Sequence, residues 1–218
     1  MTTKPKLVLY SYWRSSASYR VRMALNLKGL DYEIRPIHLV KDGGQQYADG
    51  YLALNPQGLV PTLVDGDTVI TQSLAMLEYL EERYPAPALL PSDPAGRARV
   101  RAIALAIACD IHPLNNLRVL KHLVAELDVS EENKLDWYRH WTESGLAAVE
   151  RLLAQGAGDF CHGDEPSLAD CCLLPQVYNA HRFNCNMTSL REVLRISKNL
   201  EALDSVRQAA PENQPDAE

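Results

Sequence analysis

The 218-residue sequence predicts an α/β domain over residues 1–86 followed by an all-helical domain over residues 87–218. In the first part, short β-rich runs alternate with amphipathic helical patterns. Four prolines then gather within residues 85–96. Proline at this density disfavours both helix and central strand, so the segment is expected to be a linker. After it, apolar residues recur at helical spacing and no strand pattern follows.

The α/β domain is predicted to have the element order βαβαββα. A strand is expected at Lys6–Tyr10 and a helix at Ser16–Lys28, which Gly29 would end. A second strand is expected at Tyr32–Pro36. Turn signals at Asp42-Gly43-Gly44 and at Asn55-Pro56-Gln57-Gly58 follow.

A hairpin is predicted where Thr62–Val64 and Thr68–Thr71 flank Asp65-Gly66-Asp67, because two β-rich runs around an Asp-Gly turn favour this structure. Gln72–Tyr84 follows as a helix with leucines along one side.

In the second domain, Ser167 and Asp170 have the spacing of a capping box before an apolar run, which predicts the start of a buried helix. The last ten residues contain two prolines and are expected to form a frayed tail.

Composition restricts the function classes. The net charge of −6 argues against a general nucleic-acid-binding protein, and no apolar run is long enough to span a membrane. The segment Met1–Lys6 leads into an apolar run too short for a signal peptide. Five cysteines without a C-x-x-C pair indicate free thiols in a reducing cytoplasm, and the histidines lack metal-ligand spacing. A metal site is therefore not expected.

The turn over Tyr12–Arg20 lies between the first strand and the first helix. It and the helix start carry three hydroxyls and three cations, namely Ser15, Ser16, Ser18, Arg14, Arg20 and Arg22. A helix N-terminus presents unpaired N–H groups and partial positive charge, which favour an anion such as a carboxylate or a thiolate. No cysteine lies in the turn, so a thiolate must arrive with a ligand.

Several motifs resemble those of the cytosolic glutathione transferases, in particular the zeta class. They occur in family order over nearly the whole chain: Ser15-Ser16-Ala17-Ser18-x-Arg20, Lys41-Asp42-Gly43-Gly44-Gln45-Gln46, Asn55-Pro56-Gln57, Val60-Pro61-Thr62-Leu63, Gln72-Ser73-Leu74-Ala75, Asp110-Ile111-His112-Pro113-Leu114-Asn115-Asn116 and Leu174-Pro175-Gln176-Val177. The resemblance implies a thioredoxin-like first domain and a helical substrate-binding domain. The chain departs from the family pattern at Ala17, where cysteine is common, and at Leu190-Arg191, where Tyr-Pro is frequent.

The resemblance implies that Ser15 donates a hydrogen bond to the sulfur of glutathione, which favours the thiolate. Ser16 and the backbone N–H groups of Ala17 and Ser18 would be secondary donors, with Ser15 and Ser16 as the catalytic pair. The alternative for Ser15 is a helix cap without catalytic role, as is common for serine.

The resemblance also assigns the remainder of glutathione. Val60-Pro61 resembles the cis-proline element whose preceding backbone pairs with the peptide; otherwise it is an ordinary trans bond. The N-terminus of the helix that begins at Gln72 and Ser73 would hold the γ-glutamyl carboxylate. The alternative is that Ser73 is only an N-cap of this helix. Gln46 would reach the glycyl end, or be a polar loop residue.

His112-Pro113 interrupts a helical pattern, and a bend there would turn His112, Asn116 and Arg118 toward a cleft beside the first domain. A buried or dimer-interface histidine is the alternative. The glutathione-binding residues implied by the resemblance are Ser15, Ser16, Ala17, Ser18, Tyr19, Arg20, Gln46, Val60, Gln72, Ser73, His112, Asn116, Leu117 and Arg118.

Arg14 and Arg182 are candidate clamps for substrate carboxylates, because arginine binds carboxylates bidentately; solvated surface charges are the alternative.

The resemblance implies glutathione-dependent isomerisation of maleylacetoacetate to fumarylacetoacetate in tyrosine and phenylalanine breakdown, by a cytoplasmic homodimer. The same chemistry on maleylpyruvate, a general transferase or dehalogenase activity, and a glutathione-binding module without turnover stay open. A thiol-disulfide reductase is disfavoured because the turn lacks cysteine.

Overall fold

The computed structural model describes residues 7–218, which form two compact units. Unit 1 comprises the described residues up to Ala88 together with Leu203–Glu218, and unit 2 comprises Leu89–Ala202. This grouping differs from the expected division into 1–86 and 87–218, because the end of the chain packs with the α/β elements. Lys6, at the start of the first expected strand, and the rest of Met1–Lys6 lie outside the described residues.

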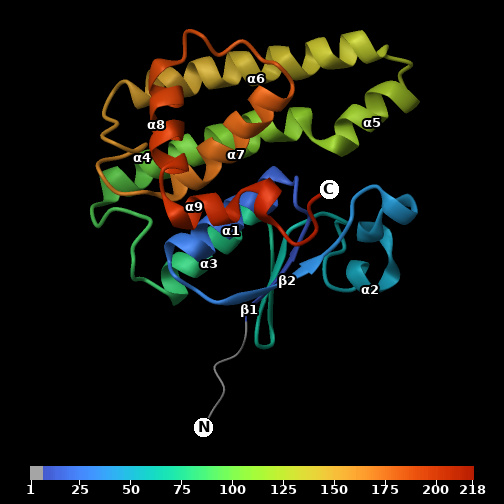
Figure 1. Cartoon of the computed structure of the whole chain (residues 1–218), viewed down its shortest axis with the longest axis horizontal. Helices are drawn as coiled ribbons and strands as arrows, with labels where there is room; N and C mark the ends of the chain where they lie inside the picture. Colours follow the sequence, from blue (N-terminus) through green and yellow to red (C-terminus); the bar gives the residue numbers. More distant parts are fainter. Residues whose placement is uncertain (1–6) are drawn as a thin grey trace. The chain divides into compact units, whose positions relative to one another are not determined.

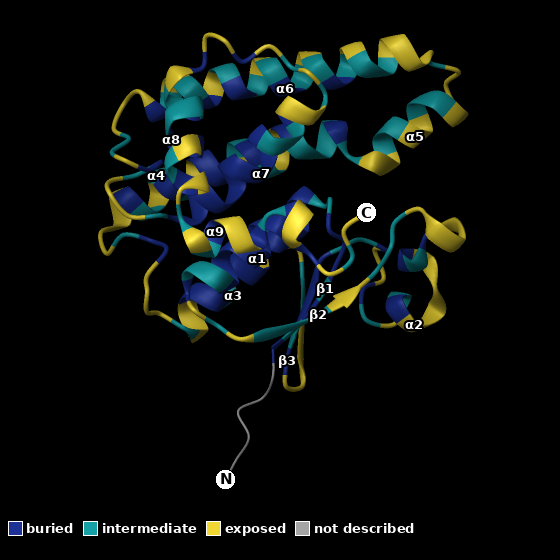
Figure 2. Cartoon of the chain, viewed as in Figure 1, coloured by how far each residue is buried: buried dark blue, intermediate teal, exposed yellow. Residues whose placement is uncertain are grey.

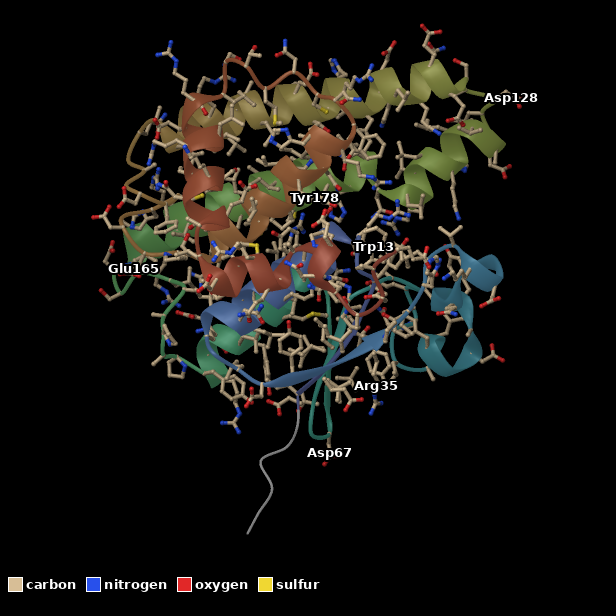
Figure 3. The ribbon with its side chains drawn as sticks, viewed as in Figure 1. Trp13, Arg35, Asp67, Asp128, Glu165 and Tyr178 are labelled. Atoms are coloured by element: carbon tan, nitrogen blue, oxygen red, sulfur yellow. The ribbon has the colours of Figure 1, made fainter. Side chains whose placement is uncertain are left out.

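A four-stranded mixed sheet forms the centre of unit 1. Its strands are β1 (Leu7–Ser11), β2 (Tyr32–Pro36), β3 (Thr62–Asp65) and β4 (Thr68–Thr71), in the order β2-β1-β3-β4. β2 is parallel to β1, whereas β3 is antiparallel to both β1 and β4. The arrangement confirms the predicted thioredoxin-like sheet, including the hairpin, whose tip carries Asp67 (Figure 3).

Helices α1 (Ser16–Leu27) and α3 (Ser73–Arg83) pack side by side, and α9 (Asp204–Ala209) packs against α1 (Figure 1). The short α2 (Asp49–Leu52) follows the 3-10 turns η1 (Lys41–Gly43) and η2 (Gln45–Tyr47). Helix α1 contributes to the core of the unit, since its fully buried residues include Val21, Met23, Ala24 and Leu25. Burying a valine, leucine or methionine side chain stabilises the fold by about 1.5–3 kcal/mol.

The end of the chain is ordered rather than frayed, so this prediction was wrong. Pro211 opens the 3-10 turn η5 (Pro211–Asn213) and is buried. Gln214 is also buried, and its Nε2 donates to the carbonyls of Gln208 and Ala210 at 2.9 and 2.7 Å. The polar, proline-containing composition of these residues is typical of a disordered tail. In the structure, however, the Gln214 side chain binds backbone carbonyls at the end of α9.

Unit 2 is helical, as predicted. Its elements are α4 (Pro94–Leu105), η3 (Ala106–Ile111), η4 (His112–Asn115), α5 (Leu117–Ala125), α6 (Glu131–Leu153), α7 (Leu168–Arg182) and α8 (Arg191–Glu201). Within residues 89–202 the only β pairing is an isolated bridge between Ala157 and Gly163. Helix α7 is buried along most of its length (Figure 2) and packs against α4 and α8.

The capping box predicted at the start of α7 is confirmed. The N–H and hydroxyl of Ser167 donate to Oδ2 of Asp170 at 2.8 and 2.7 Å, and the N–H of Cys161 donates to Oδ1 at 3.0 Å. The expected linker over residues 85–96 is shorter than predicted, because Asp93 caps α4 and Pro94 is its first residue. In the described part of the chain, no helix is long and apolar enough to cross a membrane.

Candidate active site

Ser15 is the N-cap of α1. Its backbone is extended (φ −70°, ψ 118°), and its Oγ accepts a hydrogen bond from the N–H of Ser18 at 3.2 Å. The side chain is half-buried. A hydroxyl that accepts one hydrogen bond keeps its own proton available to donate. The capping alternative is therefore realised, and it leaves Ser15 able to donate to a ligand sulfur as well.

Arg14 is held by the two aromatic residues that precede it. Its Nη2 donates to the hydroxyl of Tyr12 at 3.2 Å, and its guanidinium lies 4.6 Å from the ring centroid of Trp13. A cation over an indole face is favourable by roughly 0.5–2 kcal/mol, depending on its desolvation. Local contacts therefore orient this half-buried guanidinium next to Ser15.

The following residues of α1 turn mostly inward. Ser16, Ser18 and Tyr19 are buried, whereas Ala17 is half-buried. The Ser18 N–H, predicted as a secondary donor to the ligand, donates to Ser15. Tyr19 lies under the guanidinium of Arg22, which is 5.4 Å from its ring centroid.

The start of α3 differs from an ordinary capped helix. Gln72 has a positive φ of 68°, and no side chain caps the helix. Its Nε2 instead donates to Oε1 of Gln57 at 2.6 Å. Ser73 is buried and accepts from Nη1 of Arg20 at 3.3 Å. This places a cation of α1 at the N-terminus of α3, where helix N–H groups already favour an anion.

The Val60–Pro61 peptide bond is cis, as the family resemblance implied. The carbonyl of Leu59, just before it, accepts from the hydroxyl of Tyr51 at 2.6 Å and from Nδ2 of Asn55 at 2.7 Å. Two donors on one carbonyl fix the backbone that leads into Val60.

Gln46 is a buried residue of η2. Its Nε2 donates to the carbonyl of Leu39 at 3.4 Å, and its amide packs over the backbone of Gly44. A Cβ on Gly44 would lie 2.6 Å from this Nε2, and the φ of Gly44 is 107°. The positive φ favours glycine there, because other residues rarely adopt this backbone conformation.

The other predicted contacts belong to unit 2. The bend expected at His112-Pro113 is present, as the π-helical η3 passes into the 3-10 turn η4. Asn116 then caps α5 by accepting from the N–H of Arg118 at 3.1 Å. His112 is half-buried, whereas Leu117 and Arg118 are exposed.

Arg182 is an exposed residue in the last turn of α7, with its guanidinium 5.0 Å from the ring centroid of Phe183. A solvent-accessible guanidinium supported by a ring can accept a carboxylate without first breaking an ion pair. Its exposure fits both a clamp and the alternative of a solvated surface charge, so the role of Arg182 as a clamp stays a prediction.

Sequence reasoning missed Arg22 as a structural residue of the turn. It is fully buried, and its Nη2 donates to the carbonyl of Trp13 at 3.0 Å. Burial lowers the pKa of Arg22 to about 10, against the opposing field of nearby groups that include Asp216. It remains a cation at neutral pH. The sequence placed Arg22 among the cations near the turn, but it gave no signal that this side chain would be buried.

Over residues 7–218, no three His, Cys, Asp or Glu side chains are grouped so that they could hold a metal ion.

Known proteins are similar to this chain over nearly its whole length. The model of the glutathione S-transferase N-terminal domain matches residues 9–88, and that of the C-terminal domain matches residues 142–185. A probable maleylacetoacetate isomerase of Vibrio cholerae is 53% identical over 211 residues, which cover 97% of this chain and 98% of the relative. The chain belongs to the glutathione S-transferase family.

Similar solved structures indicate the class within the glutathione S-transferase family. A holo structure of maleyl pyruvate isomerase, described as a bacterial zeta-class enzyme, matches with a TM-score of 0.93 and 46% identity over 97% of this chain and 100% of that one. A maleylacetoacetate isomerase of Anaeromyxobacter dehalogenans with bound glutathione matches with a TM-score of 0.89 and 43% identity over 99% and 100%. The resemblance to the zeta class is confirmed.

Proposed function

We propose that this protein is a glutathione-dependent cis–trans isomerase that converts maleylacetoacetate to fumarylacetoacetate. The observation that carries the proposal is the turn before α1, where Ser15 presents a hydroxyl at a helix N-terminus that contains no cysteine. Such a site can stabilise a thiolate but cannot supply one. The relatives with nearly full-length similarity support glutathione as the source of the thiol.

The residues fit a thiol-containing tripeptide with carboxylates at both ends. The hydroxyl of Ser15 and the helix N-terminus favour the thiolate. Ser73, Arg20 and the uncapped N–H groups of α3 suit the γ-glutamyl carboxylate. The backbone of Val60 would pair with the peptide, and Gln46 would bind near the glycyl end.

When bound, glutathione supplies a thiolate that adds to the activated double bond, permits rotation about the resulting single bond and is then eliminated. Free thiols ionise at a pKa near ~8.5, so Ser15 must favour the charged form at neutral pH. Arg14, fixed by Tyr12 and Trp13, would hold a substrate carboxylate and stabilise the negative charge that develops on the conjugated carbonyl. Arg182 would hold the second acidic group.

The remaining predicted contacts are carried over as part of this proposal. Ser16 would assist Ser15, and Ala17, Ser18 and Tyr19 would shape the turn. In unit 2, the proposed glutathione contacts are His112, Asn116, Leu117 and Arg118. We further propose a cytoplasmic homodimer that acts in tyrosine and phenylalanine breakdown; a light-scattering mass near the 24.3 kDa of one chain would contradict the dimer.

Maleylpyruvate is the second candidate substrate, because the maleyl pyruvate isomerase structure is 46% identical to this chain. It needs the same addition and elimination on a smaller diacid. General transferase or dehalogenase activity uses the same thiolate, and a binding module without turnover would need only the glutathione contacts.

The proposal is tested by supplying the purified protein with glutathione and following maleylacetoacetate and maleylpyruvate in parallel. We expect glutathione-dependent formation of the trans isomer, with the higher kcat/KM for maleylacetoacetate. Faster conversion of maleylpyruvate would assign the second candidate. Glutathione binding without conversion of either acid would contradict the isomerase function and favour a glutathione-binding module without turnover.

A further inference from the structure

The peptide unit of Trp13 is held from both sides, two residues before Ser15. Its N–H donates to Oδ2 of Asp216 at 3.0 Å, and its carbonyl accepts from Nη2 of Arg22 at 3.0 Å. Trp13 and Asp216 are 203 positions apart in the sequence. In Figure 3, Trp13 lies beside the last segment of the ribbon.

Arg22 connects the same turn to the end of α9. Its Nε donates to the carbonyl of Ala209 at 2.9 Å, and its Nη1 donates to Oγ of Ser11 at 3.1 Å. One buried guanidinium therefore binds the end of β1, the turn and the last residue of α9, which lies two positions before the terminal segment Pro211–Glu218. Arg22 and Asp216 thus bind the carbonyl and the N–H of the Trp13 peptide, respectively.

The terminal segment also supplies negative charge to this buried cation. Asp216 and Glu212 both raise the pKa of Arg22, which opposes the lowering caused by burial. A buried charge without compensation is costly, so these carboxylates help to keep the arginine protonated in place.

A second contact joins the terminal segment to the residues that precede Gln46. Glu218 pairs with Nζ of Lys41 and lies 3.5 Å from Nε2 of His38. The Nδ1 of His38 accepts the N–H groups of Val40 and Lys41 at 3.1 and 2.9 Å. Exposed ion pairs are weak, so we expect Asp216 to contribute more than Glu218.

We propose that the terminal segment Pro211–Glu218 positions the glutathione site, with Asp216 as the positioning residue for the turn that carries Arg14 and Ser15. Asp216 acts through the Trp13 peptide and does not need to touch the ligand. This inference rests on the proposed function, since it assumes that the turn binds the thiol of glutathione.

The test compares Asp216→Ala with Asp216→Asn, which keeps an acceptor oxygen for the Trp13 N–H. Asp204→Asn is the control, because Asp204 is an exposed residue of the neighbouring helix α9 that pairs with Arg207. For each variant, calorimetry gives the Kd of glutathione, and the ultraviolet absorbance of the thiolate gives the pKa of the bound thiol. Neither readout requires an isomerase substrate.

We expect Asp216→Ala to weaken glutathione binding about tenfold, the equivalent of one hydrogen bond, and to raise the pKa of the bound thiol. Asp216→Asn should restore most of the glutathione affinity and most of the lowering of the thiol pKa. Asp204→Asn should have the Kd and the thiol pKa of the wild type. If Asp216→Ala does not fold, as judged by thermal unfolding, Asp216→Ser replaces it, because the short hydroxyl cannot reach Trp13.

Wild-type Kd and wild-type thiol pKa in a folded Asp216→Ala or Asp216→Ser variant would overturn the inference. Equal losses in Asp216→Asn and Asp216→Ala would overturn the assigned action through the Trp13 hydrogen bond, since the acceptor oxygen would then be irrelevant and only the charge beside Arg22 would matter. Binding that depends on Asp216 in a protein that isomerises neither acid would contradict the proposed isomerase function and leave the positioning role intact.

Discussion

Helices α1 and α3 both begin after a strand, and both place a serine at the start, yet their N-termini are completed differently. At α1, Ser15 adopts an extended backbone and its Oγ accepts the N–H of Ser18. At α3, Gln72 has a positive φ and no side chain caps the helix. The first N-terminus satisfies one of its N–H donors with its own serine, whereas no side-chain hydrogen bond caps the second.

This difference matches two ligand chemistries. The self-capped α1 presents a hydroxyl proton, which suits a sulfur that needs one directed hydrogen bond. The uncapped α3 presents backbone N–H groups with Arg20 beside Ser73, which suits a carboxylate with two acceptor oxygens. One helix start would therefore control reactivity and the other affinity.

The largest effect is expected from Ser15→Ala. Loss of a hydrogen bond to a charged group costs about 1.5–3 kcal/mol, so kcat at neutral pH should fall by roughly 10- to 150-fold. Steady-state kinetics with saturating glutathione measures this change. Ser15→Thr, which keeps the hydroxyl, should retain most of the rate.

Ser15→Asp separates the cap from the donor. Aspartate caps helices well but, when ionised, cannot donate a hydrogen bond to sulfur. We expect a thermal unfolding midpoint close to that of the wild type and almost no turnover. A variant that is equally active would show that capping is the whole role of Ser15.

A smaller effect, confined to affinity, is expected from Ser73→Ala. Removing this hydroxyl from the α3 N-terminus should raise the Kd of glutathione about tenfold and leave kcat at saturation nearly unchanged, because the group lies away from the sulfur. Isothermal titration calorimetry measures the Kd of glutathione, and steady-state kinetics measures kcat. A fall in kcat at unchanged Kd would remove the distinction between the helices.

S-methylglutathione sharpens the same distinction, because it keeps the γ-glutamyl carboxylate and has no ionisable thiol. Ser73→Ala should weaken its binding by the same factor as that of glutathione. Ser15→Ala should change its Kd by less than about threefold, since no thiolate is being stabilised. Competition with a fluorescent glutathione analogue gives the four ratios, and the reverse pattern would contradict the assignment.

The smallest effect is expected from Gln72→Gly. A non-glycine residue with positive φ is strained, and glycine adopts this conformation freely, so we expect the variant to unfold within about 1 kcal/mol of the wild type despite losing the contact with Gln57. Urea denaturation measures the change. A loss well above this would show that the Gln57 contact, and not the backbone, fixes the start of α3.

Much of the fold could be predicted from local sequence patterns. The strand at Tyr32–Pro36 and the hairpin around Gly66 have strong local signals, and the structure reproduces both. The cis bond before Pro61 has no local signal and was predicted from the family resemblance alone.

The site was only partly predictable because some of its contacts are long-range. The family resemblance implied site roles for Ser15 and Gln72, which stay predictions, and nothing in the sequence gave a reason to connect Asp216 with Trp13. A proline-containing polar end resembles a frayed tail when its partner carbonyls and N–H groups are not visible. The burial of Arg22 was not predicted for the same reason, since burial of a cation depends on elements that are distant in sequence.

The most direct test of the role assigned to the α1 N-terminus is the pKa of the thiol of bound glutathione, titrated by its ultraviolet absorbance in the wild type and in Ser15→Ala. The wild type should show a pKa clearly below the free value of ~8.5, so that the thiolate and the isomerisation rate rise with pH through this lower value. In Ser15→Ala, the pH midpoints of both the thiolate titration and the isomerisation rate should shift toward the pKa of the free thiol. The same lowered pKa in the two proteins would contradict the assignment of Ser15 as the donor to sulfur.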